Sequence, residues 1–206
     1  MSRSNIHYEE KRDELARQVF DIFMNNGYEN TTLALIVRAL KISKGALYHY
    51  FTTKEECADA AVALYSQICY EKVVCKIDDS VPAETNFKNL IFACSSLFQD
   101  SEKSMKNINT PANAIFHQKL MASLVKSLAP AYAEVIRQGI HEEKFEAEYP
   151  LETAHMILTL TNFYFDADLF GWKPEEMPEK LNAFEGFLTR ALKARPGLFS
   201  FLNNVD

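Results

Sequence analysis

Apolar positions between residues 33 and 51 fall into two short helical registers separated by a tight break. The first register repeats at i, i+3, i+4 and i+7, as does the inward face of a two-turn helix: Leu33, Ile36, Val37 and Leu40. The stripe stops at Lys41, and Ser43 offers a side chain that can cap a second helix. From Ser43 onward, helical spacing places Leu47 and Phe51 on one face. Two short helices joined by a turn are typical of a helix-turn-helix.

The opposite face of the second helix combines small residues with polar aromatic ones. Gly45 and Ala46 add little bulk, so the backbone can approach a groove closely. Tyr48 and His49 on the same side offer a hydroxyl and an imidazole. These groups suit contacts with phosphates and base edges better than they suit an ordinary solvated face.

Charge strengthens this interpretation. The segment Thr31–Lys54 contains four cations and no Asp or Glu, within a chain whose formal net charge is −6. A local positive stripe on an acidic protein is typical of a nucleic-acid contact. Pairs of short amphipathic helices also occur in many all-helical proteins that do not bind DNA. The missing acids, the small residues and the exposed aromatic residues favour DNA binding over that alternative.

Specific residues in this region match a known family. The matching positions are Phe23, Gly27, Tyr28, Thr31, Thr32, Ile36, Ser43, Lys44, Gly45, Leu47, Tyr48, Phe51, Lys54 and Glu55. With these residues, the stretch from about Val19 to Cys57 resembles the amino-terminal domain of the tetracycline-repressor (TetR) family of bacterial transcription factors. Lys41 departs from the family pattern, which usually has Gly in this turn. Lys41 therefore either takes a left-handed conformation, at about 1 kcal/mol, or forms a different turn.

The resemblance implies a homodimeric transcriptional repressor that binds a palindromic operator and is released by a small molecule. Base-edge or near-base positions are implied for Lys44, Gly45, Ala46, Tyr48 and His49. Phosphate positions are implied for Thr32, Tyr50 and Lys54, and Thr31 is placed in the same DNA-binding set. His49 and Tyr50 reverse the order of aromatic residue and histidine found in many relatives.

Residues that cap or interrupt helices predict an all-α protein of about nine helices. Two of these are the helices of the helix-turn-helix. The other seven are expected from near Tyr8 to Asn26, from Thr53 to about Ile77, from about Glu84 to Gln99, from Pro111, from Pro130 to about Glu143, from Pro150 to about Phe170, and from Met177 to Ala194. Residues 100–109 are expected to form a loop or contain a short helix. We expect a three-helix DNA-binding domain over residues 1–54 and a helical ligand-binding and dimerisation domain over residues 55–206.

The last two expected helices are apolar on more than one side, which indicates burial on more than one side. One alternative is that both only face the core of a monomer. The favoured interpretation is a four-helix interface with a second copy, because reading a palindrome requires two-fold symmetry. The residues predicted for this interface are Leu158, Phe165, Phe184, Phe187, Leu188 and Ala191.

Aromatic and polar residues of the second half are candidates for the lining of an effector pocket, although ordinary core packing is the stronger explanation for each. These candidates are Phe92, Phe98, Phe116, His155, Thr159 and Phe163. The effector is expected to be a small molecule of unknown identity. A constitutive or architectural DNA-binding protein that senses nothing remains an alternative.

Other classes receive less support. No stretch of about 18 apolar residues suggests a membrane span, and the polar start MSRSNIHYEEKRDE does not resemble a signal peptide, so a cytoplasmic, nucleoid-associated protein is expected. The four cysteines lack CxxC spacing and are expected to be reduced, buried thiols, and the five histidines form no metal motif. No nucleophile–base pair or phosphate loop supports an all-helical enzyme. No cofactor or metal is expected.

Overall fold

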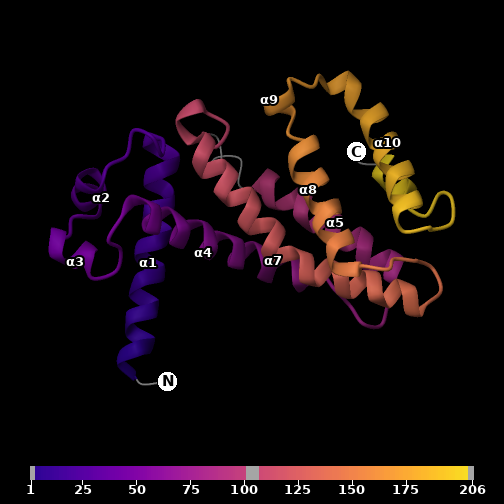
Figure 1. Ribbon diagram of the computed structural model, residues 1–206, viewed down its shortest axis with the longest axis horizontal. Coiled ribbons are helices and arrows are strands. Elements are labelled where there is room, and N and C mark those ends of the chain that lie inside the picture. The colour runs from indigo at the N-terminus through magenta and orange to yellow at the C-terminus, as the bar shows by residue number, and fades with distance from the viewer. Residues whose placement is uncertain (1–2, 101–106, 204–206) are drawn as a thin grey trace. The chain divides into compact units, whose positions relative to one another are not determined.

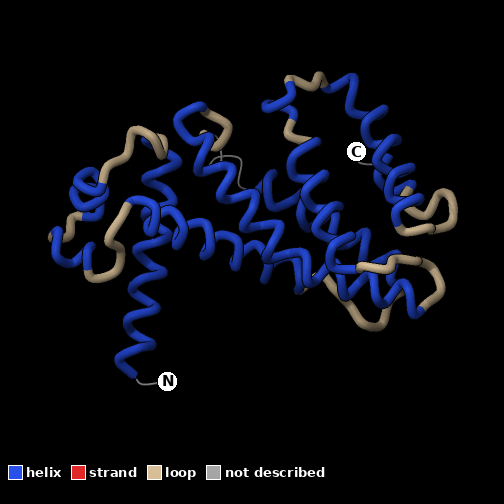
Figure 2. Tube along the Cα trace, viewed as in Figure 1, coloured by secondary structure: helices blue, strands red, loops and turns tan. Residues whose placement is uncertain are grey.

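A computed structural model describes residues 3–100 and 107–203, and of residues 3–5 and 97–100 it describes the backbone alone. Within this part of the chain there are nine α-helices, three short 3-10 helices and no strand (Figure 2). The prediction of an all-α protein is confirmed. Residues 101–106, which include most of the expected loop, lie outside the described residues.

Figure 1 shows the helices in chain order, coloured from indigo at the N-terminus to yellow at the C-terminus. Their bounds are α1 Arg3–Asn26, α2 Leu33–Leu40, α3 Lys44–Tyr48, α4 Lys54–Val74, α5 Ala83–Asp100, η1 Pro111–Asn113, α7 Ala114–His141, α8 Pro150–Tyr164, α9 Ala167–Phe170, η2 Pro174–Glu176, α10 Met177–Ala191 and η3 Ser200–Asn203. Most expected helices are present, with ends shifted by a few residues. The first helix begins five residues earlier than expected.

Two predictions were wrong, one about a helix start at a proline and one about the length of a helix. Pro130 does not begin a helix but lies inside the continuous helix α7. Its side chain is on the exposed side, so the carbonyl that loses its N–H donor can bond water instead. The helix expected from Pro150 to Phe170 is split, because α8 ends at Tyr164 and the Asp166 side chain caps α9 by accepting from the Leu169 N–H at 3.0 Å.

The chain forms two compact units. The first contains residues up to 69 together with residues 98–123, and the second contains residues 70–97 and 124–206. The unit that carries α2 and α3 therefore extends past the predicted boundary at residue 54. It includes most of α4 and the beginning of α7.

An aromatic cluster forms the core of the first unit. The Phe116 ring is fully buried and lies 5.1 Å from the Phe23 ring and 5.5 Å from the Phe20 ring, between ring centroids. Tyr28 packs on Phe23 at 5.1 Å, directly after Gly27, whose φ of 84° ends α1 in the left-handed conformation. Burial of each ring stabilises the unit by about 1.5–3 kcal/mol. The start of α7 is thus part of the core beneath the helix-turn-helix.

The second unit has its own aromatic core. Phe87 contacts the rings of Tyr132, Phe145 and Phe199 at centroid distances of 5.9, 6.0 and 5.3 Å. All four side chains are almost completely buried. This core joins α5 and α7 to the end of the chain.

The cysteines differ from expectation at one position. Cys57, Cys69 and Cys94 are buried and form no disulfide, but Cys75 is exposed, because it follows the last residue of α4. The prediction that all four are buried was therefore wrong for Cys75. In the described residues no group of His, Cys, Asp or Glu could hold a metal ion, and none of the helices there is long and apolar enough to span a membrane.

Candidate nucleic-acid interface

The start of helix α2 is fixed by one of the two threonines that precede it. The Thr32 hydroxyl accepts a hydrogen bond from the Leu35 N–H at 3.2 Å, and the Thr32 side chain remains exposed. This capping leaves other amides of the first turn directed outward, where an anion such as a phosphate is favoured. Of the two threonines that the sequence offered as the cap of this helix, Thr32 is the one that caps it.

Thr31 has a different role. Its side chain is 1% exposed, and its hydroxyl donates to the Gly27 carbonyl at 2.7 Å. The hydroxyl thus stabilises the turn between α1 and α2 from the inside. This corrects the assignment of the Thr31 side chain to the DNA-binding set, since a buried, paired hydroxyl cannot reach a phosphate.

The turn between α2 and α3 has the left-handed conformation. Lys41 has φ 53° and ψ 38°, and its N–H donates to the Arg38 carbonyl at 3.2 Å. This is the conformation that Gly adopts without strain, so Lys41 accepts a cost of about 1 kcal/mol. The Lys41 side chain is exposed and adds a positive charge beside α3.

Helix α3 is short and anchored by two buried residues. The Ser43 hydroxyl accepts from the Ala46 N–H at 3.1 Å and begins the helix. Leu47 and Phe51 are both 0% exposed, which confirms the predicted inward face. A helix of five residues has little stability of its own, so this anchoring holds it in place.

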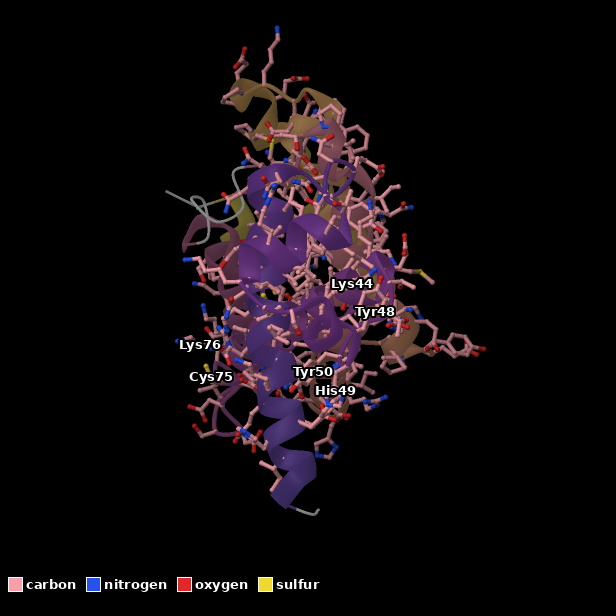
Figure 3. The ribbon with its side chains drawn as sticks, turned by 90° about the vertical axis from the view of Figure 1, so that its left-hand side faces the viewer. Lys44, Tyr48, His49, Tyr50, Cys75 and Lys76 are labelled. Carbon is pink, nitrogen blue, oxygen red and sulfur yellow. The ribbon has the colours of Figure 1, made fainter. Side chains whose placement is uncertain are left out.

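The outward face of α3 carries the predicted mixture of small and aromatic residues. Figure 3 shows Lys44 close to Tyr48, whose ring centroid lies 5.4 Å from the lysine ammonium. Gly45, Ala46 and His49 are exposed, and a Cβ added to Gly45 would meet nothing closer than the Ser43 Oγ at 4.0 Å. Tyr50 is half-buried. The exposed side of α3 therefore combines a cation, a bare backbone segment and polar aromatic groups, with no acid.

Lys54 is held more firmly than its sequence position suggests. Its ammonium donates to the Tyr28 carbonyl at 3.1 Å and lies 4.2 Å from the centroid of the Tyr28 ring. The Tyr28 hydroxyl in turn donates to the Glu55 carboxylate at 3.3 Å. Burial, followed by the charge of Glu55, raises the pKa of Tyr28 to about 12, so this hydroxyl stays protonated. Periodicity gave no indication of this contact, because the partners are 26 residues apart.

The start of α4 has a modified capping box. The Thr53 hydroxyl accepts from the Glu56 N–H at 3.0 Å, as the spacing predicted. The Glu56 carboxylate accepts from Thr52 instead of Thr53, at 2.6 Å from the N–H and 2.9 Å from the hydroxyl. The Thr52 N–H is the main cause that lowers the pKa of Glu56 below its ordinary value. This cap fixes Lys54, which begins the helix.

The candidate effector residues that the structure describes have different environments. Phe116 belongs to the core of the first unit, and the Phe98 side chain lies outside the described residues. Phe92 is half-buried against Phe201, at a centroid distance of 5.8 Å. On α8, His155 is half-buried, Thr159 is exposed and Phe163 is 57% exposed. Thr159 and Phe163 therefore belong to a surface of the second unit rather than to a cavity lining.

A cleft of about 410 Å³ lies elsewhere in the second unit, beside α7. Its lining residues are Ile77, Asp79, Glu134, Val135, Arg137, Gln138 and His141. Four of them, Glu134, Arg137, Gln138 and His141, are spaced as one face of a helix. None of these residues is among the candidates predicted from the sequence, because the cleft joins residues 77 and 79 to one side of α7, more than 50 residues later in the chain.

The predicted dimer residues divide into two groups. Leu158, Phe184 and Leu188 are at most 6% exposed within one chain, so they pack in its core and do not offer a surface to a second copy. This corrects their assignment. Phe165, Phe187 and Ala191 are half-buried.

Large apolar side chains do remain exposed on α8 and α9. They are Met156 (61%), Leu160 (37%), Phe163 (57%), Leu169 (56%) and Phe170 (40%), which we call the apolar α8–α9 face. The three α8 residues follow i, i+4, i+7 spacing and so share one side of the helix. Among these residues only Phe163 has a role predicted from the sequence, as a candidate pocket residue.

The packing of α1, α2 and α3, with a short capped helix presenting an acid-free face, defines a helix-turn-helix DNA-binding protein. Comparison with known families agrees. Residues 20–67 match the family described as "Bacterial regulatory proteins, tetR family", and residues 97–187 match "Tetracyclin repressor-like, C-terminal domain". The chain belongs to the TetR family of transcriptional regulators, which are not enzymes.

Individual relatives cover most of the chain. It is 23% identical to the uncharacterized HTH-type transcriptional regulator YhgD of Bacillus subtilis (strain 168) over 81% of this chain and 86% of that protein. A TetR-family regulator from Pectobacterium atrosepticum has a similar fold, with a TM-score of 0.66, 16% identity, and coverage of 93% of this chain and 98% of that one. A putative TetR-family regulator from Shewanella sp. PV-4 has a TM-score of 0.59 and 19% identity, with coverage of 88% of this chain and 97% of that one.

Proposed function

We propose that this protein is a dimeric repressor that inserts α3 into the major groove of a palindromic operator and leaves the DNA when a small molecule binds. The observation that carries the proposal is the exposed, acid-free face of α3. Lys44, Tyr48 and His49 would meet base edges from this face. Gly45 and Ala46 leave space for the helix backbone to approach the groove.

Phosphate contacts are proposed for the residues around this helix. Thr32 lies at the amino-terminal end of α2 and Lys54 at that of α4, where the helix dipole favours an anion. Tyr50 follows α3 with a half-buried ring and is the third such residue. These contacts would fix the position of α3 on the duplex without reading its sequence.

A DNA-binding titration tests this arrangement. The probe is a duplex identified by footprinting the protein on the DNA upstream of its own gene, and an unrelated duplex of the same length is the control. Tyr48→Ala and His49→Ala should each weaken binding to the footprinted duplex by about 1–3 kcal/mol, and should change binding to the control duplex much less. Equal losses on both duplexes would contradict base reading by this face.

Lys54→Ala should behave differently. Loss of one phosphate contact should weaken binding to both duplexes and reduce the slope of log affinity against log salt by about 1. Because Lys54 also contacts Tyr28, melting must be measured in parallel. A slope equal to that of the wild type would show that Lys54 makes no phosphate contact.

Dimerisation is proposed through the apolar α8–α9 face. Several large apolar side chains gathered on one surface are typical of a binding site, and a palindromic operator calls for a second copy of this chain. Phe163→Glu should give monomers in sedimentation and abolish tight operator binding, since one recognition helix cannot span half-sites about 34–36 Å apart. Tyr149→Glu, at an exposed position just before α8, is the matched control. A Phe163→Glu protein that stays dimeric and binds the operator would place the interface elsewhere.

Release by a small molecule is the remaining part of the proposal. The aromatic content of the second half supports it, with half-buried Phe92 and His155 as candidate contacts. A thermal-shift screen with lipophilic cations, acyl compounds and antibiotics should identify a compound that raises the melting temperature and lowers operator affinity. A regulator that binds DNA constitutively would respond to none of them.

A further inference from the structure

The amino-terminal part of α1 contacts the end of the recognition helix. The Tyr8 hydroxyl donates to the His49 carbonyl at 3.3 Å, across 41 residues of sequence. The Tyr8 ring stacks on the Tyr50 ring, with centroids 4.9 Å apart and planes 26° apart. It also lies edge-on to the His49 ring, at 5.4 Å and 85°. One side chain of α1 therefore contacts both aromatic residues that end the α3 segment.

These contacts occur where α3 ends. The helix ends at Tyr48, and His49 is its C-cap residue. The Leu47 carbonyl accepts from the Tyr50 N–H at 2.9 Å, so the backbone is closed while the His49 and Tyr50 side chains point away from the helix core. His49 and Tyr50 contact each other at 4.9 Å, between ring centroids, but both are at least partly exposed. Their orientation thus depends on a neighbouring element, and Tyr8 supplies the contact.

The next turn of α1 supports the same region. Arg12 lies four residues after Tyr8, and so on the same side of the helix. Its guanidinium carbon is 5.5 Å from the centroid of the Phe51 ring, which anchors α3 in the core. Two successive turns of α1 therefore meet the residues that follow α3. The sequence pattern predicts a helix that begins near Tyr8 and indicates no role for the Tyr8 side chain.

We propose that Tyr8 is a positioning residue of the DNA interface, orienting His49 and Tyr50 so that α3 reads its sequence in the correct pose. The proposal rests on the proposed role of α3 as the recognition helix. Tyr8 acts through its two aromatic neighbours and carries no charge to a phosphate. Its loss should therefore impair sequence-specific binding more than general attraction to DNA.

Four full-length variants test this: Tyr8→Ala, Tyr8→Phe, Tyr50→Ala and the double variant Tyr8→Ala/Tyr50→Ala. The probes are a duplex selected by the wild-type protein from a random pool and an unrelated duplex. Tyr8→Ala should weaken binding to the selected duplex by roughly three- to tenfold, the range expected from losing an aromatic pair. Binding to the unrelated duplex should fall less, by no more than Tyr50→Ala lowers it, and the salt slope should stay near wild type because no cationic side chain is removed. Tyr8→Phe keeps the ring and should lose less than Tyr8→Ala.

The double variant provides a readout that a structural role alone would not affect. If Tyr8 acts through Tyr50, adding Tyr8→Ala to Tyr50→Ala should cost less affinity than Tyr8→Ala costs alone. Independent, additive losses would overturn the proposal, as would unchanged affinity of Tyr8→Ala for the selected duplex. A changed salt slope would instead indicate a direct phosphate contact and would also overturn it.

Lys44→Ala and Tyr48→Ala separate this proposal from the one on which it rests. If both weaken binding to the selected duplex and Tyr8→Ala does not, α3 reads DNA and only the role of Tyr8 is wrong. If none of the three variants weakens binding, α3 is not the recognition helix. Thermal melting of Tyr8→Phe and Tyr8→Ala, compared with wild type, verifies that the folded state is retained.

Discussion

The Asn113 side-chain oxygen accepts a hydrogen bond of 2.7 Å from the backbone N–H of Tyr28, 85 residues earlier in the chain. Asn113 is fully buried, and its amide donates to the Asn107 carbonyl at 3.0 Å. Next to it, the Glu29 N–H donates to the Ala112 carbonyl at 2.9 Å. The short helix η1 thus holds the turn between α1 and α2, and through Tyr28 it supports the position of Lys54.

Asn113→Ala should destabilise the protein because it leaves the buried Tyr28 N–H without an acceptor. The expected loss in the free energy of unfolding is about 1–3 kcal/mol. Urea denaturation measures it. Asn30→Ala is the matched control, since the Asn30 amide bonds the Asn26 carbonyl at an exposed position and its removal should cost no more than about 0.5 kcal/mol. Equal effects of the two variants would contradict a special role for the buried bond.

Two glycines inside helices should respond in opposite directions to the same substitution. A Cβ at Gly139 in α7 would overlap the Phe145 ring, so Gly139→Ala should destabilise by about 1–3 kcal/mol. At Gly186 in α10 the nearest atom is the end of the flexible Arg190 side chain, at 3.3 Å. Gly186→Ala should therefore stabilise by about 0.5–1 kcal/mol. Thermal melting of both variants checks the signs, and a stable Gly139→Ala protein would show that the Phe145 ring can move aside.

Short-range patterns predicted the helix-turn-helix well because its information is local. The buried pair Leu47 and Phe51, the cap at Ser43 and the exposed face of α3 all follow from spacing within about ten residues. The predicted DNA contact of the Thr31 side chain was wrong, because spacing alone does not show which of two neighbouring threonines points outward from a turn. Only the fold decides that the Thr31 hydroxyl turns inward to Gly27.

The second half was harder to predict because its contacts are distant in sequence. Apolar periodicity identifies a buried side of a helix but does not distinguish a protomer core from a dimer interface. Leu188 and Phe163 illustrate this, since the first is fully buried and the second is 57% exposed. Local rules favour a helix start at Pro130, whereas buried residues on both sides of it, such as Leu128 and Tyr132, maintain α7 as one helix through this position.

Lys41→Gly should stabilise the protein, because it removes the cost of a left-handed conformation at a non-glycine residue. The gain should reach about 1 kcal/mol, reduced somewhat by the greater freedom of glycine in the unfolded chain. Lys44→Gly is the control, because Lys44 begins α3 and glycine should weaken that helix. Melting temperatures should therefore move in opposite directions. A destabilised Lys41→Gly protein would show that the Lys41 side chain contributes more than its backbone costs.

Acid should remove the stabilisation that the Glu56 carboxylate provides. Hydrogen bonds from Thr52, principally from its backbone N–H, lower the pKa of Glu56 below the ordinary value of 4.5 in the folded protein. A carboxylate with a lowered folded-state pKa stabilises the protein above pH 4.5, and this stabilisation is lost as pH falls from 4.5 through the folded-state value. The stability difference between wild type and Glu56→Gln should therefore shrink below pH 4.5 in urea titrations. Glu148→Gln, at an exposed loop position, is the control, and a constant difference across the pH range would rule out this coupling.

Thiol chemistry should distinguish Cys75 from the other three cysteines. Burial raises the pKa of Cys57 to about 12 and that of Cys94 to about 11, so neither forms much thiolate at neutral pH. Cys69 is 3% exposed and is shielded from reagents, whereas Cys75 is exposed at the end of α4. Ellman's reagent should therefore modify one thiol rapidly in the native protein and all four after denaturation. Cys75→Ser should abolish the rapid phase, and Cys69→Ser should preserve it. A rapidly reacting thiol in the Cys75→Ser protein would show that one of the buried cysteines becomes accessible in solution, which would contradict the burial of Cys57, Cys69 and Cys94.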